Sequence, residues 1–216
     1  MRFFVLLFVF ACFGTTFGIT GSDSIQTISQ SGFKCLKSNG HSFFIARVYK
    51  SDGTVDEVGV QNLINARETG WEFYDSYMFP CLRKDCPSAA DQVETVISRL
   101  DGVDARGDTI WIDVEPLSWP KNKTYNQQFI TDMLDEIRKW GIGHGVYTKY
   151  EHWDAIVGAN WTYENGAGLW WNANNGNQDF SGFKPFGGWT RPWIHQYSAS
   201  VNGPCGITMN MNWFPF

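Results

Sequence analysis

Two acidic residues end an apolar run near the middle of the chain. Residues 109–114, Thr-Ile-Trp-Ile-Asp-Val, have the pattern of a buried strand, and Asp113 and Glu115 come at its end, before Pro116. Side chains two positions apart on a strand point the same way, so the two carboxylates would share one face, about 7 Å apart. Their repulsion would raise the pKa of one of them and give an acid beside an ionised partner. An ordinary exposed strand end would carry the same residues, so the pair alone does not establish chemistry.

The other residues of the chain limit the reactions that such a pair could catalyse. Paired carboxylates without metal ligands are typical of glycosidic bond hydrolysis. The chain has no phosphate-binding loop, no His-Glu-x-x-His run and no Gly-x-Ser-x-Gly nucleophile elbow. We therefore expect no metal and no cofactor. The histidines are scattered, and each is expected to be a core or surface residue rather than a ligand: His41, His144, His152 and His195.

Composition argues against two classes of partner. The formal net charge is −5 and there is no basic run, so we expect neither nucleic acid nor an anionic membrane surface as a partner. Aromatic residues make up 17% of the chain and include eleven Trp. Clefts rich in aromatic residues often stack on sugar rings, although a Trp-rich core would give the same composition.

The first residues predict a secretory signal. One arginine, Arg2, precedes the apolar residues 5–13 and small residues follow, which indicates a signal at 1–18 with cleavage after Gly14 or Gly18. The apolar run is too short to cross a membrane, and no second run of spanning length follows. We expect residues 19–216 to form one domain. Two glycosylation sequons agree weakly with secretion: Asn122-Lys-Thr124 and Asn160-Trp-Thr162.

The cysteines indicate disulfides. Four lie beyond the signal: Cys35, Cys81, Cys86 and Cys205. An even number in a secreted chain suggests two bridges, with three possible pairings. Cys81 and Cys86 are near enough in sequence to close a local loop, which would leave Cys35 with Cys205.

Strand-like and helix-like segments alternate along the chain, which indicates a parallel sheet, either doubly wound or closed into a barrel. Eight predicted strands favour an irregular (β/α) barrel in which about five strand–helix units precede three strands without helices. The predicted strands are 18–24, 40–49, 73–79, 109–114, 143–148, 168–172, 191–197 and 208–213. The predicted helices are 25–37, 58–69, 88–100, 124–140 and 150–157.

Polar side chains stand at the ends of these strands. In (β/α) barrels the functional residues lie at the carboxyl ends of the strands, so these side chains are the candidate site. They are Asp23, Tyr77, Asp113, Glu115, Tyr147, Asn172, Gln196 and Asn210.

Several short motifs, taken together, give the chain a family resemblance. It resembles the glycoside hydrolase family 25 lysozymes (Chalaropsis-type muramidases), in the form found in secreted protist and nematode proteins, over nearly all of residues 19–216. The motifs are Phe33-Lys-Cys-Leu-Lys37, Ser42-Phe-Phe-Ile-Ala-Arg47, Tyr77-Met-Phe-Pro-Cys81, Trp111-Ile-Asp-Val-Glu115, Gly145-Val-Tyr147-Thr148, Leu169-Trp170, Pro185-Phe-Gly-Gly-Trp189 and Gln196-Tyr197.

The resemblance implies an irregular barrel and cleavage of the β-1,4 bond between N-acetylmuramic acid and N-acetylglucosamine in bacterial peptidoglycan. It implies that Glu115 is the general acid. It also implies that Asp113 stays ionised and either orients the acetamido group of the sugar or stabilises the cationic transition state. A third acid after the first strand maps to Asp23, although Gly21-Ser-Asp-Ser24 departs from the usual motif and a register with Thr20 is the alternative. The implied substrate-binding residues are Tyr77, Tyr147, Trp170, Asn172, Gln196 and Asn210.

The chain departs from the family pattern near its end. Asn210 stands where the family has a fourth carboxylate, and Trp171-Asn172 differs from the family after Leu169-Trp170. Two hypotheses follow. The first is an active secreted muramidase used in defence or in digesting bacteria, which the intact Asp113 and Glu115 favour. The second is a weakly active or inactive peptidoglycan-binding protein on the same barrel, which Asn210 favours. We expect a monomer, outside the cell or in a lysosomal or vesicular lumen.

Overall fold

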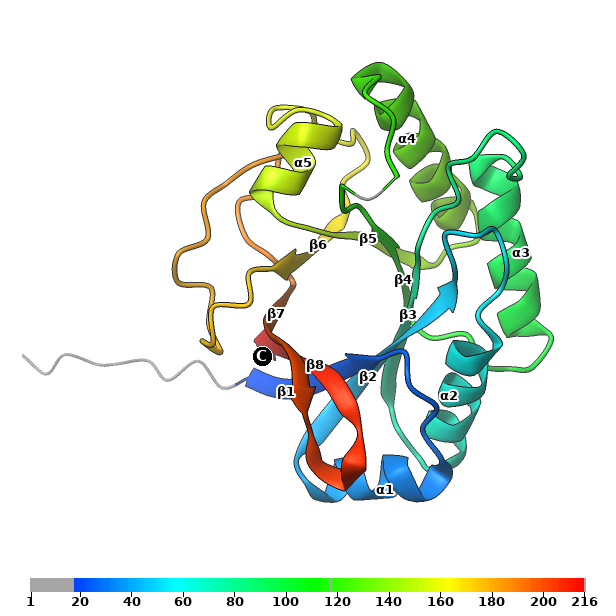
Figure 1. Ribbon diagram of the computed structural model, residues 1–216, viewed down its shortest axis with the longest axis vertical. Coiled ribbons are helices and arrows are strands. Elements are labelled where there is room, and N and C mark those ends of the chain that lie inside the picture. Colours follow the sequence, from blue (N-terminus) through cyan, green and yellow to red (C-terminus); the bar gives the residue numbers. More distant parts are fainter. Residues whose placement is uncertain (1–17, 117, 216) are drawn as a thin grey trace, which may run out of the picture.

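The computed structural model describes residues 18–116 and 118–215, and almost all of the predicted signal lies outside the described residues. Eight strands form a closed barrel in chain order, with the helices around its outside (Figure 1). The strands are β1 (Gly18–Ser24), β2 (His41–Tyr49), β3 (Phe73–Met78), β4 (Thr109–Asp113), β5 (Gly143–Thr148), β6 (Gly168–Asn172), β7 (Ile194–Asn202) and β8 (Thr208–Pro215). The helices are α1 (Gln30–Ser38), α2 (Glu57–Glu68), α3 (Ala89–Asp101), α4 (Lys123–Lys139), α5 (Tyr150–Ile156) and the short 3-10 helix η1 (Pro204–Gly206).

The predicted architecture is confirmed. Each of β1 to β5 is followed by an α-helix, and β6 to β8 follow without one. The strands from β1 to β7 pair in parallel, whereas β8 is antiparallel to both β7 and β1 and so closes the barrel. The described part of the chain contains no helix long and apolar enough to cross a membrane.

The position of β4 between two cores explains why its sequence is apolar on both faces. Ile110 and Ile112 are buried in the large core between the barrel and the helices. Trp111 points the other way, into a smaller core inside the barrel that it shares with Trp170 and Tyr147. Alternate residues therefore face two apolar layers. Asp113 continues the inward-facing set that Trp111 begins.

The bounds of two predicted elements were wrong by three residues or more. The first helix begins at Gln30 rather than at Ile25, because Ser29 caps it by accepting a hydrogen bond from the Gly32 backbone N–H at 3.2 Å. β7 begins at Ile194 rather than at residue 191 and runs on to Asn202 as a hairpin with β8. Residues 198–202, Ser-Ala-Ser-Val-Asn, are mostly small or polar, so the apolar pattern gave no sign of this extension.

Two disulfides are present. Cys35–Cys205 joins α1 to η1 just before β8, and Cys81–Cys86 closes the loop after β3. The long bridge thus ties the first helix to the last hairpin, which is the part of the barrel without covering helices.

Candidate active site

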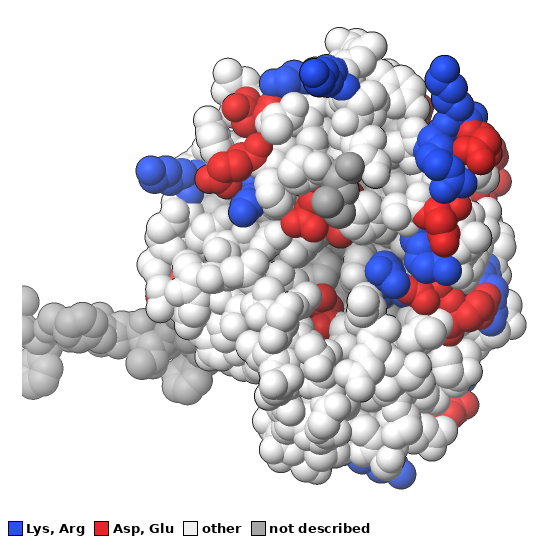
Figure 2. Space-filling view, in the orientation of Figure 1, with Lys and Arg blue, Asp and Glu red and all other residues white. Residues whose placement is uncertain are grey.

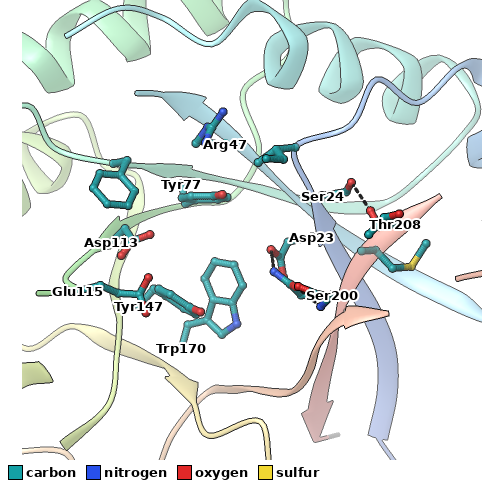
Figure 3. A pocket seen from close by; sticks show the side chains of 14 residues that line it. Asp23, Ser24, Arg47, Tyr77, Asp113, Glu115, Tyr147, Trp170, Ser200 and Thr208 are labelled. Carbon is teal, nitrogen blue, oxygen red and sulfur yellow. Dashed lines mark hydrogen bonds between the residues drawn. The ribbon is translucent and has the colours of Figure 1, made fainter. Parts of the chain in front are cut away.

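The candidate residues converge on one cleft at the carboxyl ends of the strands (Figure 3). The cleft has a volume of about 350 Å³. Figure 2 shows acidic side chains inside this hollow at the mouth of the barrel. The candidates that line it are Asp23, Tyr77, Asp113, Glu115, Tyr147, Trp170 and Asn210. Gln196 and Asn172 stand directly behind, where Gln196 binds Asp23 and Asn172 binds Glu115. Thr20, the alternative to Asp23, is not among the lining residues.

The acidic pair lies on the β4 side of the cleft. Asp113 is the last residue of β4 and only 5% exposed. Its Oδ1 atom is buried and has no hydrogen-bond partner among the described residues. Glu115, two residues later, is partly exposed and accepts a hydrogen bond from Asn172 Nδ2 at 2.9 Å. One acid is therefore buried without a donor to Oδ1, and the other has a single amide donor.

Burial raises the pKa of both acids. The pKa of Asp113 is held well above its usual value by desolvation first, and then by the negative charges of Glu115 and Asp23. Desolvation also raises the pKa of Glu115, while the Asn172 hydrogen bond and the charge of Lys149 oppose the rise. The raised pKa disfavours the ionised form of Asp113, because a buried carboxylate whose Oδ1 atom lacks a donor is costly, and the ionised state expected for Asp113 stays a prediction.

The third acid is held in a different way, on the other side of the cleft. Asp23 Oδ1 accepts hydrogen bonds from Gln196 Nε2 at 2.9 Å and Asn212 Nδ2 at 2.8 Å, and Asp23 Oδ2 accepts one from Asn210 Nδ2 at 2.8 Å. Burial raises the pKa of Asp23, and the three amides oppose that rise. Asn210, predicted from the family resemblance to stand in place of a fourth carboxylate, serves here as a donor to Asp23.

Aromatic rings form the floor and wall of the cleft. The Trp170 ring lies 4.5 Å from the Tyr147 ring and 5.9 Å from the Tyr77 ring, between centroids. Trp170 Nε1 donates to Asn212 Oδ1, and the Tyr147 hydroxyl donates to Gln196 Oε1, both at 2.8 Å. The same amides thus fix the aromatic surface and Asp23. Packed aromatic faces of this kind suit the apolar face of a sugar ring.

Sequence reasoning missed three residues of the site. His152, on α5, has its Nδ1 atom 3.5 Å from Glu115 Oε1. Asn212 bridges Asp23 and Trp170. Arg47 lines the cleft, pairs with Asp56 at 2.8 Å and lowers the pKa of Asp113 by its charge.

Two of these three residues carried a signal in the sequence. Arg47 is a charge inside an apolar strand, and Asn212 is two residues from Asn210 on the last strand. His152 carried none, because a single histidine on a helix does not reveal what faces it. No cluster of three or more potential metal ligands occurs within residues 18–116 and 118–215.

Comparisons with known proteins give the family. The model of the family described as "Lysozyme-like protein 1" matches residues 15–197. Lysozyme-like protein 5 of Caenorhabditis elegans is 41% identical over 99% of both chains, and probable GH family 25 lysozyme 2 of Dictyostelium discoideum is 36% identical over the full length of both. The chain belongs to the family 25 lysozymes. Among solved structures, a bacterial lysozyme of Streptomyces coelicolor matches this family 25 chain with a TM-score of 0.71 and 18% identity, over 92% of this chain and 93% of the other.

The predicted family is therefore confirmed, and the barrel is shared with solved lysozymes. The roles assigned to Glu115, Asp113 and Asp23 remain predictions, although the structure brings all three into one cleft.

Proposed function

We propose that this family 25 chain is a muramidase that hydrolyses the β-1,4 bond between N-acetylmuramic acid and N-acetylglucosamine in bacterial peptidoglycan. The observation that carries the proposal is the Asp113–Glu115 pair, in which Asp113 is buried and Glu115 is partly exposed, at the edge of an aromatic cleft. Both pKa values are raised, so the pair keeps a proton at a pH where free carboxyl groups have lost theirs. A proton donor beside a second carboxyl is what glycosidic cleavage requires.

Glu115 is the general acid in this proposal. It donates its proton to the glycosidic oxygen as the bond from that oxygen to the anomeric carbon breaks, and the bonding electrons stay on the oxygen. The carbonyl oxygen of the sugar's own acetamido group attacks the anomeric carbon. Water then attacks the same carbon, the bond from that carbon to the acetamido oxygen breaks, and a proton of the water passes to Glu115. Asn172 Nδ2, 2.9 Å from Oε1, stabilises the carboxylate formed between the two steps.

The unpaired Oδ1 atom indicates the role of Asp113 in the reaction. An acetamido N–H is a donor that would satisfy this buried acceptor. A hydrogen bond to the charged form lowers the pKa of a carboxyl, so the bound sugar favours ionised Asp113 and leaves the shared proton on Glu115. The ionised Asp113 described for the family thus becomes a property of the occupied cleft.

Asp23 supplies a negative charge fixed in place. The amides of Gln196, Asn210 and Asn212 hold both of its oxygens. Its charge raises the pKa of Asp113 and of Glu115 and favours the positive charge that develops on the sugar. Asn210 keeps this donor network complete, so the cleft works with three carboxylates in place of four.

Secretion is part of the proposal, to the outside of the cell or to a lysosomal or vesicular lumen. The charge and apolar pattern of residues 1–18 supports it, and so do the two disulfides, which persist in oxidising compartments. We propose that the protein acts as a monomer in defence against bacteria or in their digestion.

A second function is a peptidoglycan-binding protein with little or no turnover. The observation that favours it is Asn210, which removes a charge that the family usually has. If that charge serves as a nucleophile or base, the cleft would bind sugar but cleave it slowly.

One experiment separates these functions. Purified bacterial cell walls are incubated with the wild-type chain and with Glu115→Gln, turbidity is followed, and the products are identified by mass spectrometry. We expect wild type to clear the walls and release fragments with muramic acid at the reducing end. Glu115→Gln should lower the rate by about 10²–10⁴-fold while still binding walls. Equal clearing by both proteins would overturn the role of Glu115, and wall binding without any clearing by wild type would support the binding protein.

A further inference from the structure

A second cavity adjoins the catalytic cleft. It has a volume of about 780 Å³ and lies between the start of α5 and the segment 173–193 that joins β6 to β7. Figure 1 shows α5 and this segment on the same side of the barrel mouth. The cavity is more than twice as large as the cleft that holds the acids.

Two residues link this cavity to Glu115. Asn172 lines the cavity and donates to Glu115 Oε1 at 2.9 Å. Lys149 also lines it, and its charge lowers the pKa of Glu115. Asp23, Asp113 and Trp170 lie on the other side of Glu115, in the catalytic cleft. A polymer whose scissile oxygen meets Glu115 would therefore fill the cleft with one side of the bond and continue into this cavity.

The charges of the two cavities are opposite. The catalytic cleft contains Asp23, Asp113 and Glu115. The adjoining cavity has Lys149 and Lys184 with Glu151 as its single acid. Neither lysine is in an ion pair with another described residue. In a chain of net charge −5, two unpaired cations in one cavity are a local feature.

The walls of the cavity add apolar surface. Trp171, Tyr150 and Phe186 line it, with the Tyr150 and Phe186 rings edge to face at 5.9 Å. Tyr150 is 45% exposed. Cations beside aromatic faces fit a ligand that joins sugar rings to carboxylate groups, because the rings stack and the ammonium groups pair with carboxylates.

We propose that this cavity is a subsite for the peptide-bearing part of the substrate, in which Lys149 and Lys184 bind free carboxylates of the peptide attached to muramic acid. The inference rests on the proposed muramidase function and deepens it. It makes the chain prefer glycan strands that keep their peptides over bare glycan of the same length.

The test compares two substrates, one that keeps its peptides and one in which each removed peptide leaves a free lactyl carboxylate on muramic acid. Soluble peptidoglycan fragments are used intact or after an amidase has removed their peptides. Lys149→Met and Lys184→Met each remove one charge and keep the length of the side chain. We expect each to raise KM for intact fragments about three-fold, and the double variant about ten-fold, with no change in KM for the stripped fragments. The preference of wild type should also weaken as salt is added.

Lys184→Met is the cleaner single variant, because Lys149 also acts on the pKa of Glu115 and its loss changes kcat as well. The matched control is Lys34→Met on α1, an exposed lysine far from both cavities in the fold, which should leave both KM values unchanged. Double-variant KM values that rise equally on both substrates, or on neither, would overturn the inference.

Binding separates this inference from the proposed function. In a Glu115→Gln background, equilibrium binding of the two fragments is measured without turnover. Intact fragments should bind about ten-fold more tightly than stripped ones, and the double lysine variant should lose that preference. If wild type cleaves neither fragment but the preference is present, the muramidase proposal fails and the subsite stands. If wild type cleaves both fragments and no preference exists, the subsite fails alone.

Discussion

The acids on the two sides of the cleft are bonded in opposite ways. Asp23 accepts three side-chain amide hydrogen bonds, from Gln196, Asn210 and Asn212. Asp113 is equally buried, yet its Oδ1 atom has no hydrogen-bond partner in the described chain. Burial raises the pKa of both carboxyl groups, but only Asp23 has donors that oppose the rise.

The strands explain the difference. Asp23 is directly across from Asn210 in the antiparallel β1–β8 pair, and Gln196 is across from Asn212 in the β7–β8 pair. These two pairings together place all three amides around one carboxylate. β4 lies between parallel neighbours and ends at Asp113, where the chain turns away into a loop. The donor-rich side therefore favours the ionised form of its acid, and the donor-poor side favours the protonated form.

Asp113→Asn makes the largest change on the donor-poor side. Asparagine keeps the shape but removes the charge that would stabilise the bound acetamido group, so we expect kcat to fall by about 10²–10³-fold. Steady-state kinetics on soluble peptidoglycan fragments measure the loss. The control is Asp75→Asn, at the opposite end of the barrel, whose partly buried carboxyl has a pKa raised to about 6 by desolvation. It should leave kcat unchanged, and an equal fall in both variants would mean that loss of any acid inside the barrel is enough.

Asp113→Asn should also differ from wild type in how its stability to unfolding changes with pH. The folded state raises the pKa of Asp113 above its unfolded value, so it binds more protons than the unfolded state, and stability is lost as pH rises above about 4. Asp113→Asn should thus unfold at a higher temperature than wild type at pH 7, and the gap should close near pH 4. Thermal unfolding at both pH values measures this, and a variant less stable at pH 7 would show that Asp113 is ionised and well solvated.

Removing one amide from each side compares the two regions directly. Asn212→Ala leaves Trp170 Nε1 without an acceptor and Asp23 with one donor fewer, both in a buried site. We expect a loss of about 2–4 kcal/mol in the free energy of unfolding. Asn172→Ala removes a donor to Glu115, which is partly exposed and can bind water instead, so we expect less than about 1 kcal/mol.

The effects of the two variants on activity should have the opposite order, with the larger effect in Asn172→Ala. Without Asn172 the pKa of Glu115 rises, because the lost hydrogen bond favoured the ionised form. The alkaline limb of the pH–rate profile therefore moves to higher pH in Asn172→Ala and stays in place in Asn212→Ala. Urea unfolding together with pH–rate profiles measures both effects. Equal losses of stability in the two variants would remove the distinction between the two sides.

Sequence periodicity predicts much of this arrangement. The alternation of strands and helices gives the barrel, and the polar residues at the strand ends give the cleft. What periodicity cannot supply is contact across the barrel. Asn212 faces Asp23 because β8 is antiparallel to β1, and a single strand pattern does not reveal its direction or register. His152 lies beside Glu115 because of how α5 packs, for which a seven-residue helix carries little signal.

Asn210→Asp converts a donor on the Asp23 side into a second acid. Asp23 Oδ2 loses its hydrogen bond and gains a like charge at about the same place, so stability at pH 7 should fall by about 1–3 kcal/mol. Each acid raises the pKa of the other, so the folded state binds more protons and the loss should shrink near pH 4. We expect no gain in kcat. The control is Asn202→Asp, which adds the same charge at the exposed end of β7. A gain in kcat with unchanged stability would mean that the fourth carboxylate of the family is needed here too.

His152 offers the smallest and most specific test of the donor-poor side. Its Nδ1 atom is buried, has no hydrogen-bond partner among the described residues and lies 3.5 Å from Glu115 Oε1. Burial and the charge of Lys149 lower the pKa of His152, whereas Glu151 opposes them. In the neutral tautomer with its hydrogen on Nε2, the Nδ1 atom accepts a hydrogen bond and does not donate one, so this tautomer favours protonated Glu115. Asparagine would place an amide there that can donate, and would favour the ionised form instead.

His152→Asn should therefore move the alkaline limb of the pH–rate profile to lower pH, by less than about one unit, with little change in stability. The control is His144→Asn on β5, whose ring faces Gly166 and Ile142 rather than the acids. Its profile should match that of wild type. A limb that moves to higher pH in His152→Asn would show that His152 is charged and stabilises ionised Glu115. The β4 side would then have a donor after all, and the contrast with Asp23 would be one of degree.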